Sequence, residues 1–307
     1  MGMKSRVVGS MIVIIIISLL PLACTSRQSP AKKEYPRPAT DQHPAPKTKG
    51  ATGKTIYYQN KAVVLLYHDI DGRECGTAIG RQRFFSHLRM LEESGFAIIS
   101  LEDIVAFIEQ GKSLPANAVA ITLDDGCVSN YAEVWPALQS RHWPFSVFVT
   151  TSEMGKIRTN GLRKVNWAEL KKMSAAGVLV GSHSDNGHKT WKTMDGSQAY
   201  WLTDHFANES GQQYQARVLA DLSKSHNQLQ QQLGQPVLHF APPYGASNAS
   251  LEKLALQAGY KYIWTTKRLS IQRSTSLTSL GRVSVGIKGT SAAQVKATIL
   301  KVTKNAE

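Results

Sequence analysis

From Ala62 onward, short apolar runs rich in β-branched residues alternate with longer segments whose apolar residues recur at helical spacing. The runs are apolar throughout, so both faces of the sheet they form should be buried, as in parallel sheets covered by helices. Over about 250 residues, this pattern predicts a closed or nearly closed (β/α) barrel of seven to eight parallel strands, which can be distorted or incomplete. An open, doubly wound α/β sheet is the alternative.

The expected elements follow one another in a regular order. Ser100 and Asn166 stand where helix N-caps are expected. The strands are expected at residues 62–67, 96–100, 118–123, 145–150, 178–181, 237–241, 262–265 and 280–285. The helices are expected at residues 83–94, 100–109, 131–141, 167–176, 214–233, 250–258 and 292–301.

The amino terminus has a different character. Residues 1–23 begin with a basic stretch, continue without charge and end in small residues, which predicts a secretory signal peptide. Cys24 follows directly, so we expect lipidation there, with ordinary secretion or an uncleaved anchor as alternatives. Residues 24–55 are rich in Pro and Lys and have little to bury, which predicts a disordered tether. The folded domain is then expected at residues 56–307.

Charge and cysteine content indicate which partners and which thiol chemistry to expect. The tether carries seven basic and two acidic residues and the signal adds two basic ones, so half of the formal charge of +14 lies outside the domain. A nucleic-acid partner is therefore not expected, whereas a basic tether suits an anionic membrane surface. Cys75 and Cys127 each follow an expected strand end, so a disulfide near the site and two separate thiols both remain open.

Two adjacent carboxylates follow the strand expected at 118–123. Asp124 and Asp125 precede Gly126, and by themselves they would fit a solvated turn. At the end of a buried strand, however, neighbouring side chains diverge, so one carboxylate can bind a cation while the other accepts a proton. His68 and His183 follow other strands, and active sites of β/α barrels lie at this carboxyl-terminal face.

A second cluster of polar residues contains two histidines. His183 and His188 are separated by Ser-Asp-Asn-Gly, which favours a turn that brings the imidazoles together. Each histidine alone would more often be an ordinary hydrogen-bonded residue. Two neutral imidazoles with one carboxylate are, however, a ligand set of catalytic zinc sites.

These segments resemble a known family. Leu123-Asp124-Asp125-Gly126, the 183–188 loop and Phe240-Ala241-Pro242-Pro243-Tyr244-Gly245 are similar to the first three motifs of NodB-type polysaccharide deacetylases, carbohydrate esterase family four. Tyr67-His68-Asp69 and the five-residue histidine spacing resemble, more narrowly, the bacterial poly-β-1,6-N-acetyl-D-glucosamine N-deacetylases. The resemblance covers residues 62 to 285 in the expected order.

The resemblance implies an amide hydrolase with assigned roles. Asp125, His183 and His188 would hold one divalent metal, with zinc preferred and cobalt, nickel or iron as alternatives. Asp124 would take a proton from the activated water, and His68 would protonate the leaving amine. The backbone N–H of Tyr244 would stabilise the oxyanion, because Pro243 has no N–H.

Some features depart from the family pattern. Ala241 stands where the family usually has an arginine, so the group that tunes Asp124 is not identified, and Arg282 on the last expected strand is the candidate substitute. The segment 187–211 is long and polar and could gate the substrate. Within it, Trp191 and Trp201 are the better candidates for contact with sugar rings.

The expected function is therefore metal-dependent N-deacetylation of exported poly-β-1,6-N-acetylglucosamine, a biofilm polysaccharide. The expected partners are this polymer, the membrane through the lipid anchor, and polysaccharide export machinery. The expected location is the periplasm, at the outer membrane, because Thr25 rather than Asp follows Cys24. Two rivals remain: another N-acetylated glycan such as peptidoglycan as substrate, or a catalytically silent glycan-binding export lipoprotein.

Overall fold

The computed structural model describes residues 55–71, 74, 76–157 and 162–304. The expected signal peptide, Cys24 and the tether as far as residue 54 lie outside these residues, as does Cys75. Within the described ranges, no helix combines the length and the apolar character that crossing a membrane requires.

The main sheet is a nearly closed barrel of eight parallel strands. They lie in the order β12-β11-β10-β7-β6-β5-β1-β13, and a short strand, β4 (Ala97–Ile98), pairs with the start of β5. The eight are β1 (Ala62–Tyr67), β5 (Ala118–Leu123), β6 (Ser146–Val149), β7 (Leu179–Ser182), β10 (His239–Phe240), β11 (Tyr262–Thr265), β12 (Leu280–Gly281) and β13 (Val283–Ser284).

The two ends of this order meet on one chain segment. Only Arg282 separates β12 from β13, and β12 pairs with β11 while β13 pairs with β1. The strand expected at 280–285 is thus interrupted at Arg282, and each half completes a different side of the barrel. The barrel prediction is confirmed, and the open sheet is excluded.

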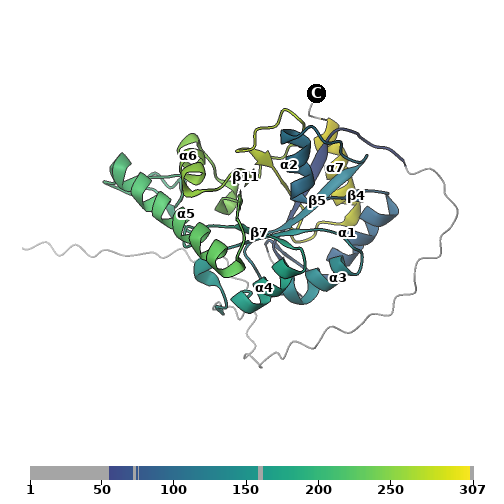
Figure 1. The fold of residues 1–307 in the computed structure, drawn as a ribbon, viewed down its shortest axis with the longest axis horizontal. Helices are drawn as coiled ribbons and strands as arrows, with labels where there is room; N and C mark the ends of the chain where they lie inside the picture. The colour runs from purple at the N-terminus through teal and green to yellow at the C-terminus, as the bar shows by residue number, and fades with distance from the viewer. Residues whose placement is uncertain (1–54, 72–73, 75, 158–161, 305–307) are drawn as a thin grey trace, which may run out of the picture. The chain divides into compact units, whose positions relative to one another are not determined.

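Helices surround the strands (Figure 1), with α5 beside α6 and α1 beside α7. Ser100 and Asn166 cap α2 and α4 as expected, each with a complete capping box. The helix expected at 131–141 instead begins as a π-helical turn, Asn130–Val134, and continues as α3, with Pro136 near the junction of the two. The helices are α1 (Arg81–Glu93), α2 (Leu101–Glu109), α3 (Trp135–Gln139), α4 (Trp167–Ala175), α5 (Gly211–Leu233), α6 (Ala249–Ala258) and α7 (Ala292–Lys304).

Strand alternation divides the core and sets the direction of Asp124. On β5, Val119 and Ile121 join a cluster with residues of most of the outer helices, whereas Ala118 and Ala120 join a second cluster with Phe148, Trp264 and residues of α2 alone among the helices. Successive side chains of a strand point to opposite faces, so Asp124 continues the row of Ala118 and Ala120. The fold therefore delivers this carboxylate to the inner side of the barrel.

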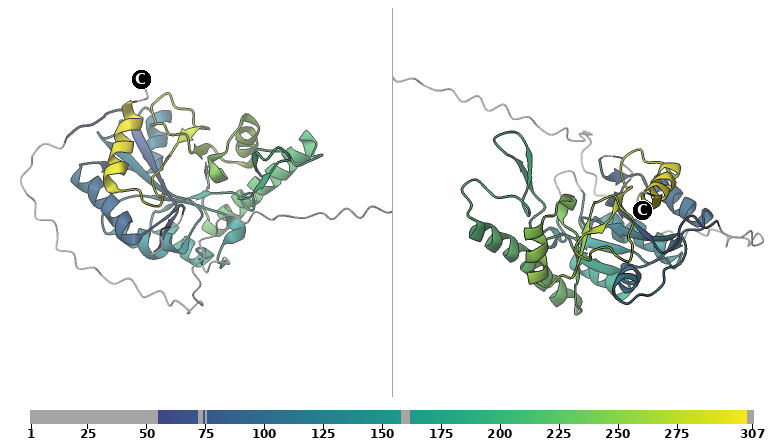
Figure 2. Two further views of the ribbon diagram at one scale, coloured as in Figure 1. Left: turned by 180° about the vertical axis from the view of Figure 1, so that it is seen from behind. Right: turned by 90° about the horizontal axis from the view of Figure 1, so that it is seen from above.

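The segment 187–211 contains an antiparallel hairpin that the sequence did not indicate. It consists of β8 (Thr190–Lys192) and β9 (Gln198–Tyr200). Figure 2 shows it in teal to green, projecting beside the long helix α5. A second pair that was not expected, β2 (Asp69–Ile70) and β3 (Ala78–Ile79), follows β1.

Candidate active site

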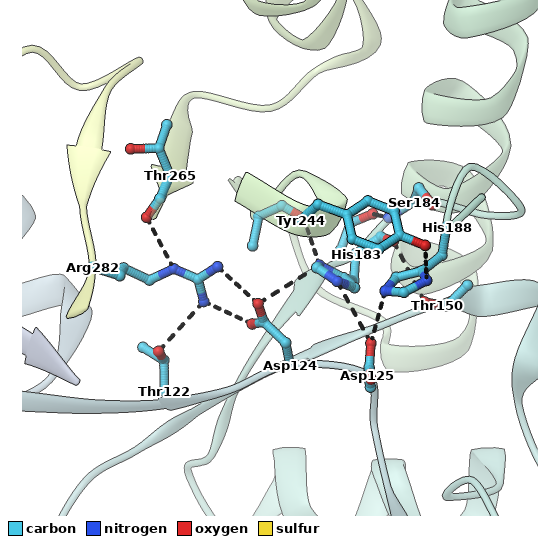
Figure 3. Close-up of polar contacts among 12 residues, drawn as sticks. Thr122, Asp124, Asp125, Thr150, His183, Ser184, His188, Tyr244, Thr265 and Arg282 are labelled. Carbon is cyan, nitrogen blue, oxygen red and sulfur yellow. Dashed lines mark hydrogen bonds and ion pairs between the residues drawn. The ribbon is translucent and has the colours of Figure 1, made fainter. Parts of the chain in front are cut away.

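The polar residues expected at strand ends do gather at the carboxyl-terminal face of the barrel. β1 and β5 pair in register at Tyr67 and Leu123, and the backbone N–H of Asp124 donates to the Tyr67 carbonyl at 3.0 Å. His68 and Asp124 therefore occupy adjacent positions on neighbouring strands. Figure 3 shows Asp124, Asp125, His183, His188 and Tyr244 facing one another.

Asp124 is buried and paired with a buried arginine. Arg282 Nη1 and Nη2 donate to its two carboxylate oxygens at 2.7 and 2.8 Å, although the residues lie 158 positions apart in the sequence. The same guanidinium also donates to Thr122 Oγ1 and the Thr265 carbonyl, both at 3.4 Å. Burial favours the neutral acid, but Arg282, through its charge and its hydrogen bonds, outweighs burial together with His183 and lowers the pKa of Asp124. Arg282 thus occupies the tuning position proposed for it.

Asp125, His183 and His188 form the described group that could hold a metal ion. Asp125 Oδ1 lies 3.6 Å from Nε2 of His183 and 3.3 Å from Nε2 of His188. This buried oxygen has no hydrogen-bond partner within the described part of the chain. An orphaned carboxylate oxygen that faces two imidazole nitrogens fits a divalent cation among them.

The protonation state of His183 agrees with a metal site formed by Asp125, His183 and His188. Burial lowers the pKa of His183 to about 4, so its imidazole is neutral at neutral pH. Its Nδ1 lies 2.7 Å from the Ala241 carbonyl, and only a protonated Nδ1 can donate there. The remaining nitrogen, Nε2, therefore carries a lone pair directed towards Asp125.

Asp125 is held in an unusual backbone conformation. Its φ is +73°, and that of the following residue, Gly126, is +59°. The buried side chain of Lys164 donates to the Asp125 carbonyl at 2.7 Å. Burial opposes ionisation of Asp125, but the pKa of this carboxyl lies well below the usual range, and the positive charge of Lys164 is among the groups that lower it. Lys164 was not identified from the sequence, where it is one lysine in a polar segment with no distinguishing pattern.

The loop that carries both histidines is fixed to helix α5. Asp221 accepts hydrogen bonds from the backbone N–H groups of Asp185 and Asn186 at 3.0 and 2.7 Å. Asp185 in turn accepts from Thr151 Oγ1 at 2.7 Å and from Lys224 Nζ at 2.8 Å. Asp221 was also missed, although the sequence holds a signal: it interrupts the apolar stripe of α5 at a buried position.

The remaining predicted residues lie near this group. The Nδ1 atom of His68 is buried and makes no hydrogen bond within the described residues, and its role as the acid stays a prediction. Tyr244 follows the proline pair with φ +63° and is 44% exposed. Cys127 is buried with its Sγ 3.7 Å from Lys164 Nζ, and a bridge to Cys75 stays a prediction because Cys75 lies outside the described residues.

The two tryptophans considered for sugar contact are both partly exposed, and each also contacts a side chain beside it. The Trp191 ring lies tilted beside Phe206, with ring centroids 5.0 Å apart, and Trp201 lies against the guanidinium of Arg217 at 4.4 Å. Arg217 also forms a two-pronged ion pair with Glu209 and donates to the Trp201 and Asp204 carbonyls. These bonds fasten the base of the insertion to α5, and gating by this segment stays a prediction.

Comparison with known proteins agrees with the fold. The family model described as polysaccharide deacetylase matches residues 111–263. A poly-β-1,6-N-acetyl-D-glucosamine N-deacetylase of Escherichia coli O157:H7 is 23% identical over 90% of this chain, which spans 43% of that relative's length. A protein of the same name from Staphylococcus epidermidis is 23% identical over 71% of this chain and 76% of its own length. The solved de-N-acetylase from Aggregatibacter actinomycetemcomitans has a TM-score of 0.70 and 22% identity, covering 78% of this chain and 99% of that chain.

Proposed function

This chain carries a polysaccharide deacetylase domain, and from that premise we propose that it hydrolyses N-acetyl groups of exported poly-β-1,6-N-acetyl-D-glucosamine, the polymer of biofilms. The observation that carries the proposal is the division of labour at the end of β5, where Asp124 is bound to Arg282 and Asp125 faces two imidazoles. The choice of polymer rests on the names of the E. coli and S. epidermidis relatives.

Asp125, His183 and His188 would hold one divalent metal. Two imidazole nitrogens and a carboxylate oxygen suit zinc, and also cobalt, nickel or iron. A metal bound there would lower the pKa of a bound water and polarise the substrate carbonyl.

The remaining residues would move protons and stabilise charge. Asp124, kept ionised by Arg282, would accept a proton from the attacking water as the new C–O bond forms. The backbone N–H of Tyr244 would stabilise the oxyanion, and His68 would give a proton to the glucosamine nitrogen as the C–N bond breaks. Acetate and the free amine are the products.

The test is release of amine from β-1,6-linked N-acetylglucosamine oligomers, compared with β-1,4-linked oligomers and peptidoglycan fragments. Chelation should abolish release and zinc should restore it. Asp124→Asn should lower the rate by about 10² to 10⁴, the usual contribution of a general base, while metal binding is retained. The exposed change Glu93→Gln should have no effect.

The outcomes separate the alternatives. Activity restricted to β-1,4-linked or peptidoglycan substrates would keep the chemistry and reject the polymer. Binding of oligomers without turnover under any of the four metals would reject the enzyme and favour a silent glycan-binding protein. An unchanged rate in Asp124→Asn would remove that residue from the role of base.

We also propose that the protein is exported and lipid-anchored in the periplasm at the outer membrane, where it would meet the polymer and its export machinery. The support is the sequence of residues 1–55, with Cys24 directly after the apolar segment. Mass spectrometry of the amino-terminal peptide from membrane fractions should find acylated Cys24. A soluble protein that begins elsewhere would reject the anchor.

A further inference from the structure

Tyr244 reaches the second histidine of the candidate metal group with its side chain. Its hydroxyl lies 3.1 Å from Nδ1 of His188, and the two ring centroids are 4.5 Å apart (Figure 3). In the proposed hydrolysis, Tyr244 acts through its backbone N–H alone. The phenol therefore makes a contact that the proposed hydrolysis does not yet use.

The contact matters because of the other nitrogen of the same ring. His188 Nε2 faces Asp125 Oδ1 at 3.3 Å, so Nε2 must carry a lone pair if it is to bind a metal. In a neutral imidazole the proton is then on Nδ1, which must donate to an acceptor. The hydroxyl oxygen of Tyr244 is the acceptor at that position.

The two histidines thus have different outer partners. His183 Nδ1 donates to the Ala241 backbone carbonyl at 2.7 Å, and no side-chain substitution removes that carbonyl. The partner of His188 is a single hydroxyl on a side chain that is 44% exposed. The second imidazole can therefore lose its partner through the removal of one oxygen atom.

We propose that the Tyr244 hydroxyl is the positioning group that fixes the tautomer and ring orientation of His188 for metal binding. The proposal rests on the metal centre of the proposed function and adds a residue to it. Partners of this kind raise the basicity of the ligand and hold its ring, and their loss typically weakens metal binding by about 10- to 100-fold.

The surrounding structure holds the phenol in place. Gly245 has φ +68°, and a Cβ there would overlap the Thr266 side chain, so the turn after the proline pair is restricted to glycine at that position. The Tyr200 ring also lies near the phenol, with its centroid 5.4 Å from that of Tyr244. Tyr200 is paired with Thr190 across the β8–β9 hairpin, so both point to one face, whereas Trp191 and Ala199 point to the other.

This arrangement connects the insertion to the candidate metal group. Trp191 on one face of the hairpin lies against Phe206, and Tyr200 on the other face lies against Tyr244. Arg217 fixes the base of the insertion on α5 through Glu209. The hairpin therefore braces the side chain that contacts His188.

The test is zinc affinity of the full chain, measured by competition with a chromogenic chelator for wild type, Tyr244→Phe and Tyr200→Phe. Tyr244→Phe should bind zinc about 10- to 100-fold more weakly. Tyr200→Phe is the matched control, because it also removes one phenolic oxygen but keeps the ring against Tyr244, and its affinity should equal that of wild type. The melting temperature of the metal-free protein should be the same in all three, because the Tyr244 side chain is half exposed.

The outcomes distinguish this inference from the proposed function. Equal zinc affinity in wild type and Tyr244→Phe would overturn the inference and leave the deacetylase proposal intact. Equal weakening in both variants would show that hydroxyls of the aromatic pair act in general, and would also overturn it. A wild-type chain that binds no divalent metal would overturn the inference together with the metal centre.

Discussion

Asp124 and Asp125 end the same strand, but the regions that hold them are built differently. Asp124 is held from across the barrel by Arg282, whose guanidinium also contacts strand residues Thr122 and Thr265. Asp125 and the two histidines are held by loops, which side chains such as Lys164 and Asp221 fix through backbone groups. We call the first the barrel half and the second the loop half of the site.

The difference has a consequence for function and stability. The barrel half lies where the barrel closes, because Arg282 is the residue between β12 and β13. A change there should affect folding and the base together. The loop half depends on local bonds outside the barrel strands, so changes there should alter the ligand group while the barrel stays folded.

The largest effect is expected from breaking the barrel half. Arg282→Met keeps much of the volume but leaves Asp124 as a buried charge without its partner. Removal of one member of a buried ion pair costs about 3–5 kcal/mol. The free energy of unfolding, measured by chemical denaturation, should fall by that amount.

Two further variants sharpen this test. Arg268→Met changes an exposed arginine of the preceding loop and should cost no more than about 0.5 kcal/mol. Adding Asp124→Asn to Arg282→Met removes the uncompensated charge, so the double variant should be more stable than Arg282→Met alone. If Arg282→Met cost no more than Arg268→Met, the distinction between the two halves would be lost.

The barrel half was largely predictable from the sequence. The alternation of apolar strands and helices indicated the barrel, and the position of polar residues after the strands indicated the active face. Arg282 could be named because the proline motif lacked the arginine usual in similar sequences. The interruption of the last strand at Arg282 was not predictable, since it depends on how the barrel closes.

The loop half was predictable in its ligands but not in its supports. Asp125, His183 and His188 are recognisable as chemical groups, whereas the partners that hold them depend on contacts between distant segments. Lys164 and Asp221 make such contacts, and so does Tyr244 through its side chain. The positive φ angles of Asp125, Ser184 and Tyr244 were likewise not predictable, because sequence patterns favour such angles at glycine and asparagine.

A smaller and pH-dependent effect is expected in the loop half. Burial raises the pKa of Asp221 to about 6, despite its bonds to the N–H groups of Asp185 and Asn186. The charged and titratable groups that face it are Asp185, which adds to the rise, Lys224, which opposes it, and Tyr260. Because the folded pKa lies above the unfolded value of 3.8, Asp221 stabilises the protein fully below pH 3.8 and loses this contribution as pH rises through 6.

Asp221→Asn isolates this contribution. The stability of wild type minus that of the variant should fall by about 3 kcal/mol between pH 4 and pH 6, at 1.36 kcal/mol per pKa unit, and stay level above. A constant offset of about 1–3 kcal/mol should be added, because the amide can accept only one of the two backbone N–H bonds. Denaturation curves measured at several pH values give the difference directly.

Asp195→Asn is the control, because it changes an exposed aspartate whose pKa is lowered by bonds from Thr193 and Ser197. Its folded pKa lies below the unfolded value, so its contribution is present at higher pH and is lost as pH falls, the opposite slope. If the stability of wild type minus that of Asp221→Asn rose with pH, as expected for the control, ionised Asp221 would not destabilise the loop half. A falling curve would mean that the clamp of the histidine loop is made at the expense of stability at neutral pH, whereas the ion pair of the barrel half adds to stability there.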